Sequence, residues 1–156
     1  MGKLNDIVRE ESFGPVVMVT DDDADTCIIL SRFLQNELQV LTARSGKECL
    51  QILKRETVDL VLLDLLMPEM GGLATLREIR GNPAIAKTPV IVVTAWDDPD
   101  ALAEAKRLGV KEYLIKPMLR RRLLRSVRTQ LQAQFGRAGV SRAAPVIKKA
   151  TLAEKK

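Results

Sequence analysis

Four apolar stretches of this 156-residue chain are each followed by polar side chains that can handle a metal ion or a phosphoryl group. Two of the stretches end in carboxylates, one in a hydroxyl and one in an amine. Clustered carboxylates repel one another and bind a hard cation such as Mg²⁺ through oxygen. A lysine and a hydroxyl beside that cation would hold the oxygens of a phosphoryl group. The side chains in question are Asp21 and Asp22, Asp64, Thr94 and Lys116.

The elements that must position these side chains are predicted strands. Val58–Leu63 is rich in Val and Leu without alternation, which is typical of a strand buried on both faces of a parallel sheet. The carboxyl ends of such strands meet at one edge, where α/β proteins bind ligands. With hydrophobic residues at 46% and aromatics at 3%, the core must be mostly aliphatic. The predicted strands are 16–20, 40–43, 58–63, 90–94 and 112–115.

Helical patterns follow each of these strands. Ser45 and Glu48 match a capping box, and Asp98-Pro99 matches a helix cap followed by proline at the first helical position. Five β-α units with short crossovers require parallel strands and right-handed connections. We therefore expect an α/β, doubly wound, flavodoxin-like (βα)5 fold with a five-stranded parallel sheet in the order 2-1-3-4-5. The predicted helices are 24–36, 46–55, 72–80, 99–109 and 119–134.

In this order and spacing, the motifs resemble those of the receiver domains of bacterial response regulators, the chemotaxis-regulator-like switches of two-component signalling. The resemblance runs from about Val16 to about Gln134, and together the motifs are highly specific. The chain departs from the family pattern at Thr20, Ala24 and Gly71, none of which touches the chemistry. The matching motifs are Asp21-Asp22, Asp64 with Leu65-Leu66-Met67-Pro68, Thr94-Ala95, and Lys116-Pro117 with Tyr113 three residues before the lysine.

For the acids, the resemblance implies a phosphorylation site with a metal ion. Asp64 would be the nucleophile that accepts a phosphoryl group and becomes an acyl phosphate. Mg²⁺ or Mn²⁺ would be held by Asp21, Asp22 and Asp64 and by the backbone carbonyl of Leu66, with Asp22 the more direct ligand. The simpler alternatives are that Asp64 starts a turn and that the acids at 21–23 cap the next helix.

For the remaining motifs, the resemblance implies phosphate binding and a conformational switch. Thr94, Ala95 and Lys116 would contact the phosphoryl group, and the peptide bond from Lys116 to Pro117 would be cis. Thr94 would move toward the phosphate and vacate space that Tyr113 then fills. The simpler alternatives are that Thr94 is an ordinary strand residue and Tyr113 an ordinary core aromatic.

Two bulky side chains flank the expected phosphorylation site. In the family, the residues two after the aspartate and two after the threonine influence water access, and here these are Leu66 and Trp96. Neither can orient a water molecule as a polar side chain would, so we expect them to shield a long-lived acyl phosphate. The alternative is that Trp96 points away, into solvent or against a helix.

The positive charge of the chain is concentrated at its end. Residues 1–118 carry a net charge of −5 and residues 119–156 a net charge of +10. In the helix 119–134, Arg121, Arg122 and Arg125 could form a docking face for an acidic partner or a like subunit, or simply a solvated surface. Nucleic acid is not supported, because no aromatics interleave with the arginines.

The leading hypothesis is a signalling switch that is not a dedicated enzyme. Its phosphoryl donor would be a histidine kinase or histidine phosphotransfer protein, since this chain has no histidine to carry the donor group itself. Its output would go to a downstream protein on the face of the last two helices, or to a homodimer formed on phosphorylation. The alternatives are a haloacid-dehalogenase-like phosphatase, whose D-x-D start Asp21–Asp23 loosely matches, and a phosphorylation-independent scaffold.

Length and composition indicate one domain in a reducing compartment. We expect an N-terminal extension at 1–14, a receiver domain at 15–135 and a basic, flexible tail at 136–156. Cys27 and Cys49 fall within helical patterns and are expected to be buried free thiols, consistent with a cytoplasmic location. No apolar run is long enough to span a membrane.

Overall fold

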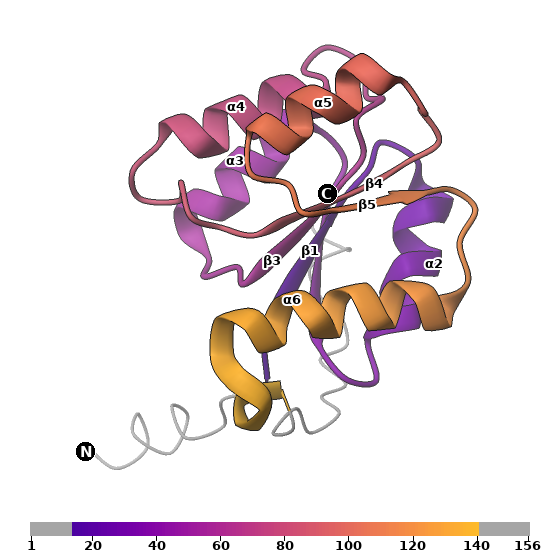
Figure 1. Cartoon of the computed structure of the whole chain (residues 1–156), viewed down its shortest axis with the longest axis vertical. Helices are drawn as coiled ribbons and strands as arrows, with labels where there is room; N and C mark the ends of the chain where they lie inside the picture. The colour runs from indigo at the N-terminus through magenta and orange to yellow at the C-terminus, as the bar shows by residue number, and fades with distance from the viewer. Residues whose placement is uncertain (1–13, 141–156) are drawn as a thin grey trace, which may run out of the picture.

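The computed structural model describes residues 14–140, which fold around a five-stranded sheet covered by helices on both faces (Figure 1). Every neighbouring pair of strands is parallel, and the strand order is β2-β1-β3-β4-β5. The predicted flavodoxin-like fold and its sheet order are confirmed. The strands are β1 (Val16–Thr20), β2 (Gln39–Ala43), β3 (Leu60–Leu63), β4 (Val90–Thr94) and β5 (Glu112–Ile115).

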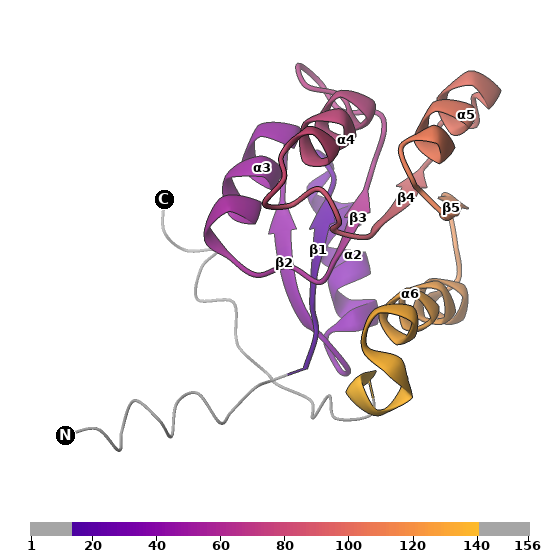
Figure 2. The ribbon, with the colours of Figure 1, turned by 60° about the vertical axis from the view of Figure 1, so that its left-hand side comes forward.

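The helices form two layers on either side of the sheet. Figures 1 and 2 show α2 and α6 on one face and α3, α4 and α5 on the other. Because all five strands run the same way, the loops that leave them toward the helices lie at one edge. The helices are α2 (Ala24–Leu34), α3 (Gly46–Arg55), α4 (Gly72–Gly81), α5 (Pro99–Arg107) and α6 (Arg120–Val140).

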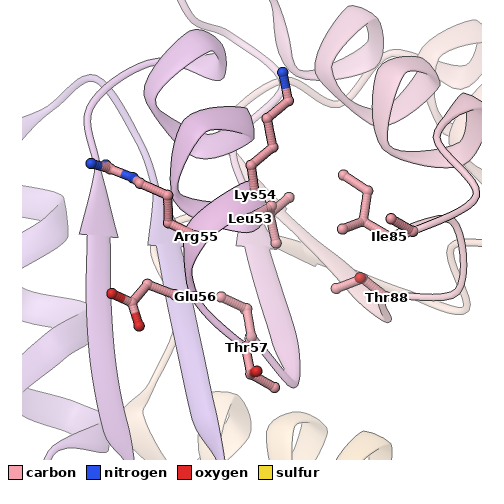
Figure 3. A pocket seen from close by; sticks show the side chains of 9 residues that line it. Leu53, Lys54, Arg55, Glu56, Thr57, Ile85 and Thr88 are labelled. Atoms are coloured by element: carbon pink, nitrogen blue, oxygen red, sulfur yellow. The ribbon is translucent and has the colours of Figure 1, made fainter.

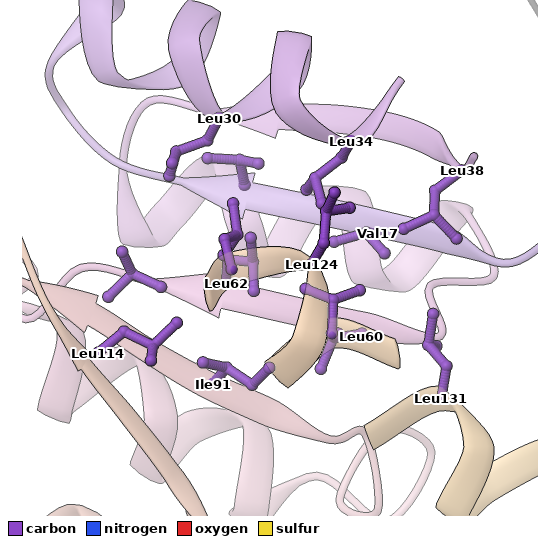
Figure 4. Packing of buried hydrophobic residues seen from close by; sticks show 14 of the residues in the cluster. Val17, Leu30, Leu34, Leu38, Leu60, Leu62, Ile91, Leu114, Leu124 and Leu131 are labelled. Carbon is purple, nitrogen blue, oxygen red and sulfur yellow. The ribbon is translucent and has the colours of Figure 1, made fainter. Parts of the chain in front are cut away.

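The core consists of two aliphatic clusters, one on each face of the sheet. Successive strand residues point to opposite faces, so Val17 and Leu62 pack with α2 and α6 (Figure 4), whereas Met18 and Val61 pack with α3, α4 and α5. Both faces of the central strands are therefore buried, which explains why their sequences do not alternate. Within residues 14–140, no helix is long and apolar enough to cross a membrane.

Three helices begin at side-chain caps. Ser45 accepts the backbone N–H of Glu48 at 3.0 Å, and Asp98 caps α5 directly before Pro99, as the sequence predicts. Asp23 caps α2. Because Asp23 takes the capping role, the two acids that precede it remain available to the sheet edge.

Several element boundaries differ by one or two residues from those expected, and two of the differences have a visible structural cause. β3 begins at Leu60 rather than at Val58, and Asp59 instead accepts the backbone N–H of Val16 through its carboxylate at 2.7 Å. The last element extends to Val140, but its helical geometry is broken at Gly136, where φ is 72°, two residues after the expected end at 134. Most of the expected N-terminal extension and tail, at 1–13 and 141–156, lies outside the described residues.

The start of α4 packs so closely on the strand end at Asp64 that only glycine fits at residue 72. A Cβ atom on Gly72 would lie 2.2 Å from the carbonyl oxygen of Asp64 and 2.5 Å from the Cα of Leu65. Gly72→Ala should therefore lower the free energy of unfolding by about 2 kcal/mol, measured by urea denaturation. As a control, Gly81→Ala at the other end of α4 meets nothing within 4 Å and should stabilise by about 0.5 kcal/mol. Equal effects of the two substitutions would contradict this account of the packing.

Candidate functional site

The ends of β3, β4 and β5 bring donors from three segments onto the carboxylate of Asp64. Its Oδ1 accepts the backbone N–H of Leu66 at 3.0 Å and the hydroxyl of Thr94 at 2.7 Å. Its Oδ2 accepts the ammonium of Lys116 at 3.2 Å. Asp64 and Thr94 are both buried, and the peptide bond after Lys116 is cis. The structure thus places these three predicted site residues in direct contact.

Asp21 is almost fully buried beside them and shares Lys116. Its Oδ1 accepts the backbone N–H of Asp23 at 2.9 Å, and its Oδ2 accepts the ammonium of Lys116. Burial raises the pKa of Asp21 above its ordinary value of 3.8, and this outweighs the opposite effect of the bond from Lys116. Burial also lowers the pKa of Lys116, but its bonds and charge interactions with Asp21 and Asp64 raise that pKa overall. The lysine therefore stays an ammonium ion that joins the two carboxylates.

The acids form a cluster whose chemistry suits a divalent cation. One carboxylate oxygen from each of Asp21, Asp22 and Asp64 lies within 4.8 Å of the others. Two oxygens bound to one Mg²⁺ lie at most about 4.2 Å apart, so a small side-chain adjustment or a bridging water is enough. Oxygen ligands are those that hard ions such as Mg²⁺ and Mn²⁺ prefer. The residues present therefore fit the expected ion.

Thr94 and Tyr113 both bind the backbone of Trp96, in the loop that begins at Ala95. The Trp96 N–H donates to the hydroxyl oxygen of Thr94 at 3.2 Å, and the Tyr113 hydroxyl donates to the Trp96 carbonyl at 2.7 Å. Burial and then the charges of nearby aspartates raise the pKa of Tyr113, which keeps the phenol protonated and able to donate. One loop residue thus connects the hydroxyl beside Asp64 with the tyrosine of β5.

The two bulky residues expected to control water access have different surroundings. Leu66 is 50% exposed, and its backbone N–H bonds Asp64 directly. Trp96 is half-buried and packs against the hydrophobic cluster under α3, α4 and α5. The Trp96 side chain therefore packs inward, whereas that of Leu66 remains half exposed.

The predicted arginine face lies on the first turns of α6. Arg121, Arg122 and Arg125 are exposed and, in the part of the chain that the structure describes, form no ion pair. Together with residues that include Glu112 and Ser126 they line a shallow groove of about 410 Å³. The Ser126 hydroxyl donates to Glu112 at 3.0 Å, which ties α6 to β5 beneath the arginines.

A second groove lies at the N-terminal ends of β3 and β4, at the edge of the sheet opposite the carboxylates. It has a volume of about 320 Å³ and separates the C-terminal end of α3 from the segment before β4 (Figure 3). Lys54, Ile85 and Thr88 are among its lining residues. These residues surround the N-terminal end of β3, whereas Asp64 follows its C-terminal end. The groove therefore takes no part in the site.

Arg44 is the residue near the site that the sequence motifs did not single out. It directly follows β2, and its Nε and Nη2 both donate to the backbone carbonyl of Asp22, at 3.1 and 2.7 Å. The signal that could have identified it is the strand order, because β2 lies next to β1. A basic residue at the end of β2 is thereby placed beside the acids at the end of β1.

Comparisons with known proteins agree on one family. The family model of the response regulator receiver domain matches residues 17–128. The transcriptional regulatory protein ZraR of Escherichia coli (strain K12) is 41% identical over 104 residues, which are 65% of this chain and 23% of that protein. A probable cyclic di-GMP phosphodiesterase of Vibrio cholerae is 33% identical over 132 residues, 85% of this chain and 30% of that protein. The chain thus spans less than a third of the length of these two relatives.

A solved structure shows the same similarity in three dimensions. The chemotaxis protein CheY4 of Vibrio cholerae superimposes with a TM-score of 0.72 at 27% identity. The superposition covers 76% of this chain and 99% of that protein, so the similarity extends over the whole of the smaller molecule.

The raised pKa of Asp21 predicts how stability depends on pH. The folded protein binds the Asp21 proton more tightly than the unfolded chain, so this group favours folding below its ordinary pKa of 3.8 and loses that effect as the pH rises through the raised pKa. Asp21→Asn lacks this titration. In metal-free buffer, its melting temperature relative to that of the wild type should therefore rise with pH above 3.8 and level off once the raised pKa has been passed. A variant that is less stable by the same amount at every pH would show that the charge itself supports the fold.

Proposed function

We infer a function from the premise that this chain belongs to the response regulator receiver domain family, whose model matches residues 17–128. Receiver domains are signalling modules of two-component systems. We propose that this one is a switch in which Asp64 accepts a phosphoryl group and a change of conformation is passed to another protein. The observation that supports this most is the contact of the Asp64 carboxylate with both Thr94 and Lys116 at the end of β3.

The proposed reaction is an attack of an Asp64 oxygen on the phosphorus of a phosphohistidine. A P–O bond forms and the P–N bond breaks, so that the imidazole leaves with the electron pair and the aspartate becomes an acyl phosphate. Thr94, Ala95 and Lys116 would then contact the oxygens of the phosphoryl group. This chain has no histidine to carry the donor group, so we propose a histidine kinase or histidine phosphotransfer protein as the donor.

The acid cluster supports a requirement for Mg²⁺, or Mn²⁺ in its place. We assign Asp22 as the more direct ligand, because Asp21 and Asp64 already share Lys116. The backbone carbonyl of Leu66 would complete the protein ligands. The bound ion would supply positive charge that offsets both the acids and the incoming phosphoryl group.

The output would be a shift between two populated arrangements of the β4 and β5 ends. Thr94 and Tyr113 contact one loop residue, so a phosphoryl group that binds Thr94 better in one arrangement would bias Tyr113 as well. We propose the unpaired arginines of α6, Arg121, Arg122 and Arg125, as the surface that reads this change. A downstream protein with an acidic surface, or a second phosphorylated copy, would complement their charge.

Neither alternative function is favoured by a specific observation. The convergence of Asp64, Thr94 and Lys116 argues against a scaffold that has lost phosphorylation. Family membership argues against a haloacid-dehalogenase-like phosphatase.

Cys27 and Cys49 are free thiols in opposite layers, and burial raises the pKa of each to about 11. Unpaired thiols support the cytoplasmic location that we propose.

Phosphorylation should map to Asp64. Incubation with acetyl phosphate and Mg²⁺ should add one phosphoryl group per wild-type chain, seen by intact mass, and Asp64→Asn should abolish the labelling. The matched control is Asp59→Asn, because Asp59 precedes the same strand at its opposite end and should not affect labelling. Undiminished labelling of Asp64→Asn would refute the assignment, and repeated turnover of acetyl phosphate at a high rate would favour a phosphatase.

The acyl phosphate should be shielded chiefly by Leu66. An asparagine at this position could orient a water molecule with one hydrogen bond of about 1 kcal/mol, which would speed hydrolysis about fivefold. The measurement is the decay of phosphorylated Leu66→Asn against wild type. Trp96→Glu should have a smaller effect because the indole packs on the core, and Leu119→Asn serves as a control at an exposed leucine of another loop. Equal decay of Leu66→Asn and wild type would show that this side chain does not limit water access.

A further inference from the structure

Arg44 binds the loop that carries the acids after β1. Its guanidinium donates from Nε and Nη2 to the carbonyl oxygen of Asp22, at 3.1 and 2.7 Å. Beside this contact, the backbone N–H of Asp21 donates to the carbonyl of Ala43 at 3.0 Å, which continues the pairing of β1 with β2. The Asp22 peptide is therefore held from the β2 side by two N–H groups of one planar side chain.

Arg44 is itself fixed by the start of α3. The carboxylate of Glu48 accepts the backbone N–H of Arg44 at 2.7 Å, while the N–H of Glu48 donates to the hydroxyl of Ser45 at 3.0 Å. The capping interactions of α3 thus determine where the Arg44 backbone lies. A continuous set of contacts therefore connects the N-terminus of α3, through Arg44, to the backbone of Asp22.

Asp22 is the acid that depends most on such support. The carboxylate of Asp64 has three hydrogen-bond donors and that of Asp21 has two. Among residues 14–140, no hydrogen bond or ion pair is made to the carboxylate of Asp22, although it lies within 4.8 Å of the other two acids. Its position is therefore set by its backbone, and that backbone is what Arg44 holds.

We propose that Arg44 is a positioning residue for the divalent cation site, which keeps the Asp22 carboxylate beside those of Asp21 and Asp64. The proposal rests on the proposed function in taking Asp22 as a metal ligand. The charge of Arg44 acts in the opposite direction, because a nearby cation repels Mg²⁺. The side chain is exposed, so water and salt screen its charge, whereas the geometry of its two hydrogen bonds is unaffected. Positioning therefore outweighs repulsion.

The test is the affinity for Mg²⁺ in the full chain. Binding is followed by the fluorescence of Trp96, the single tryptophan, and independently with Mn²⁺ from the electron paramagnetic resonance signal of the free ion. Arg44→Ala should weaken binding roughly tenfold, the effect typical of removing a group that orients a metal ligand. Arg44→Lys keeps the charge but cannot place two N–H groups in a fixed plane, so its affinity for Mg²⁺ should fall between those of the wild type and Arg44→Ala.

The control variants separate positioning from charge and from folding. Lys47→Ala removes another exposed cation, from the first turn of α3, and should bind Mg²⁺ like the wild type. The metal-free melting temperatures of the Arg44 variants should stay close to that of the wild type. If Arg44→Ala does not fold, Arg44→Gln, which keeps one amide donor without the charge, should show the same loss of affinity.

The outcomes distinguish this inference from the proposed function. If the wild type binds Mg²⁺ and both Arg44→Ala and Arg44→Gln bind it equally well or better, Arg44 does not position Asp22, and the metal site itself stands. If the wild type binds neither Mg²⁺ nor Mn²⁺, the assigned metal site fails and this inference fails with it. Labelling of Asp64 would then report separately on the phosphorylation site.

Discussion

Three carboxylates held at one edge of a sheet repel one another, and the organisation of the site depends on how that repulsion is contained. At separations of about 4 Å, each charged pair costs on the order of 1 to 4 kcal/mol near a protein surface. The structure places one ammonium, that of Lys116, between Asp21 and Asp64 and supplies backbone N–H donors to both. One lysine cannot balance three acids. The cluster therefore retains a demand for positive charge, which a divalent cation would meet.

This arrangement survives because the framework beneath it cannot relax. The central strands are buried on both faces by aliphatic side chains, so their ends cannot move apart without opening one of the two clusters. The start of α4 also rests directly on the backbone at Asp64, where the hydrogen atom of Gly72 leaves just enough room. Repulsion among the acids is thus opposed by packing on three sides, which is how a folded chain can hold like charges together.

The sequence was sufficient for the fold because several independent patterns agreed. The bounds of β1, β4 and β5 are those predicted, since apolar runs between turn residues define them clearly. The predicted start of β3 was wrong by two residues. Asp59 lies in an otherwise apolar run, but its carboxylate binds the backbone N–H of Val16 and the strand begins only after it. The predicted end of the last helix at 134 lies two residues before the break in helical geometry at Gly136, after which the segment continues to Val140.

The candidate site was predictable in its members but not in its connections. Parallel strands bring Asp21, Asp64, Thr94 and Lys116 to one edge whatever their rotamers, so sequence order and strand order determine the set. Whether Trp96 covers the site or packs inward depends on side-chain packing, which no local pattern encodes. The reach of Arg44 to a carbonyl 22 residues earlier in the chain depends on the pairing of two strands and on a rotamer. Such contacts emerge only with the tertiary structure.

The contacts of Thr94 and Tyr113 have a mechanical consequence. Both hydroxyl groups are bonded to the main chain of residue 96, one to its N–H and the other to its carbonyl oxygen, and neither bond involves the indole. The two hydroxyl groups are therefore connected through the backbone of one loop residue, in addition to the direct pairing of β4 with β5. Because this connection consists of peptide atoms, it does not require the side chain of tryptophan. The indole has a separate structural role, because its packing on the core anchors the loop in which these two bonds are made.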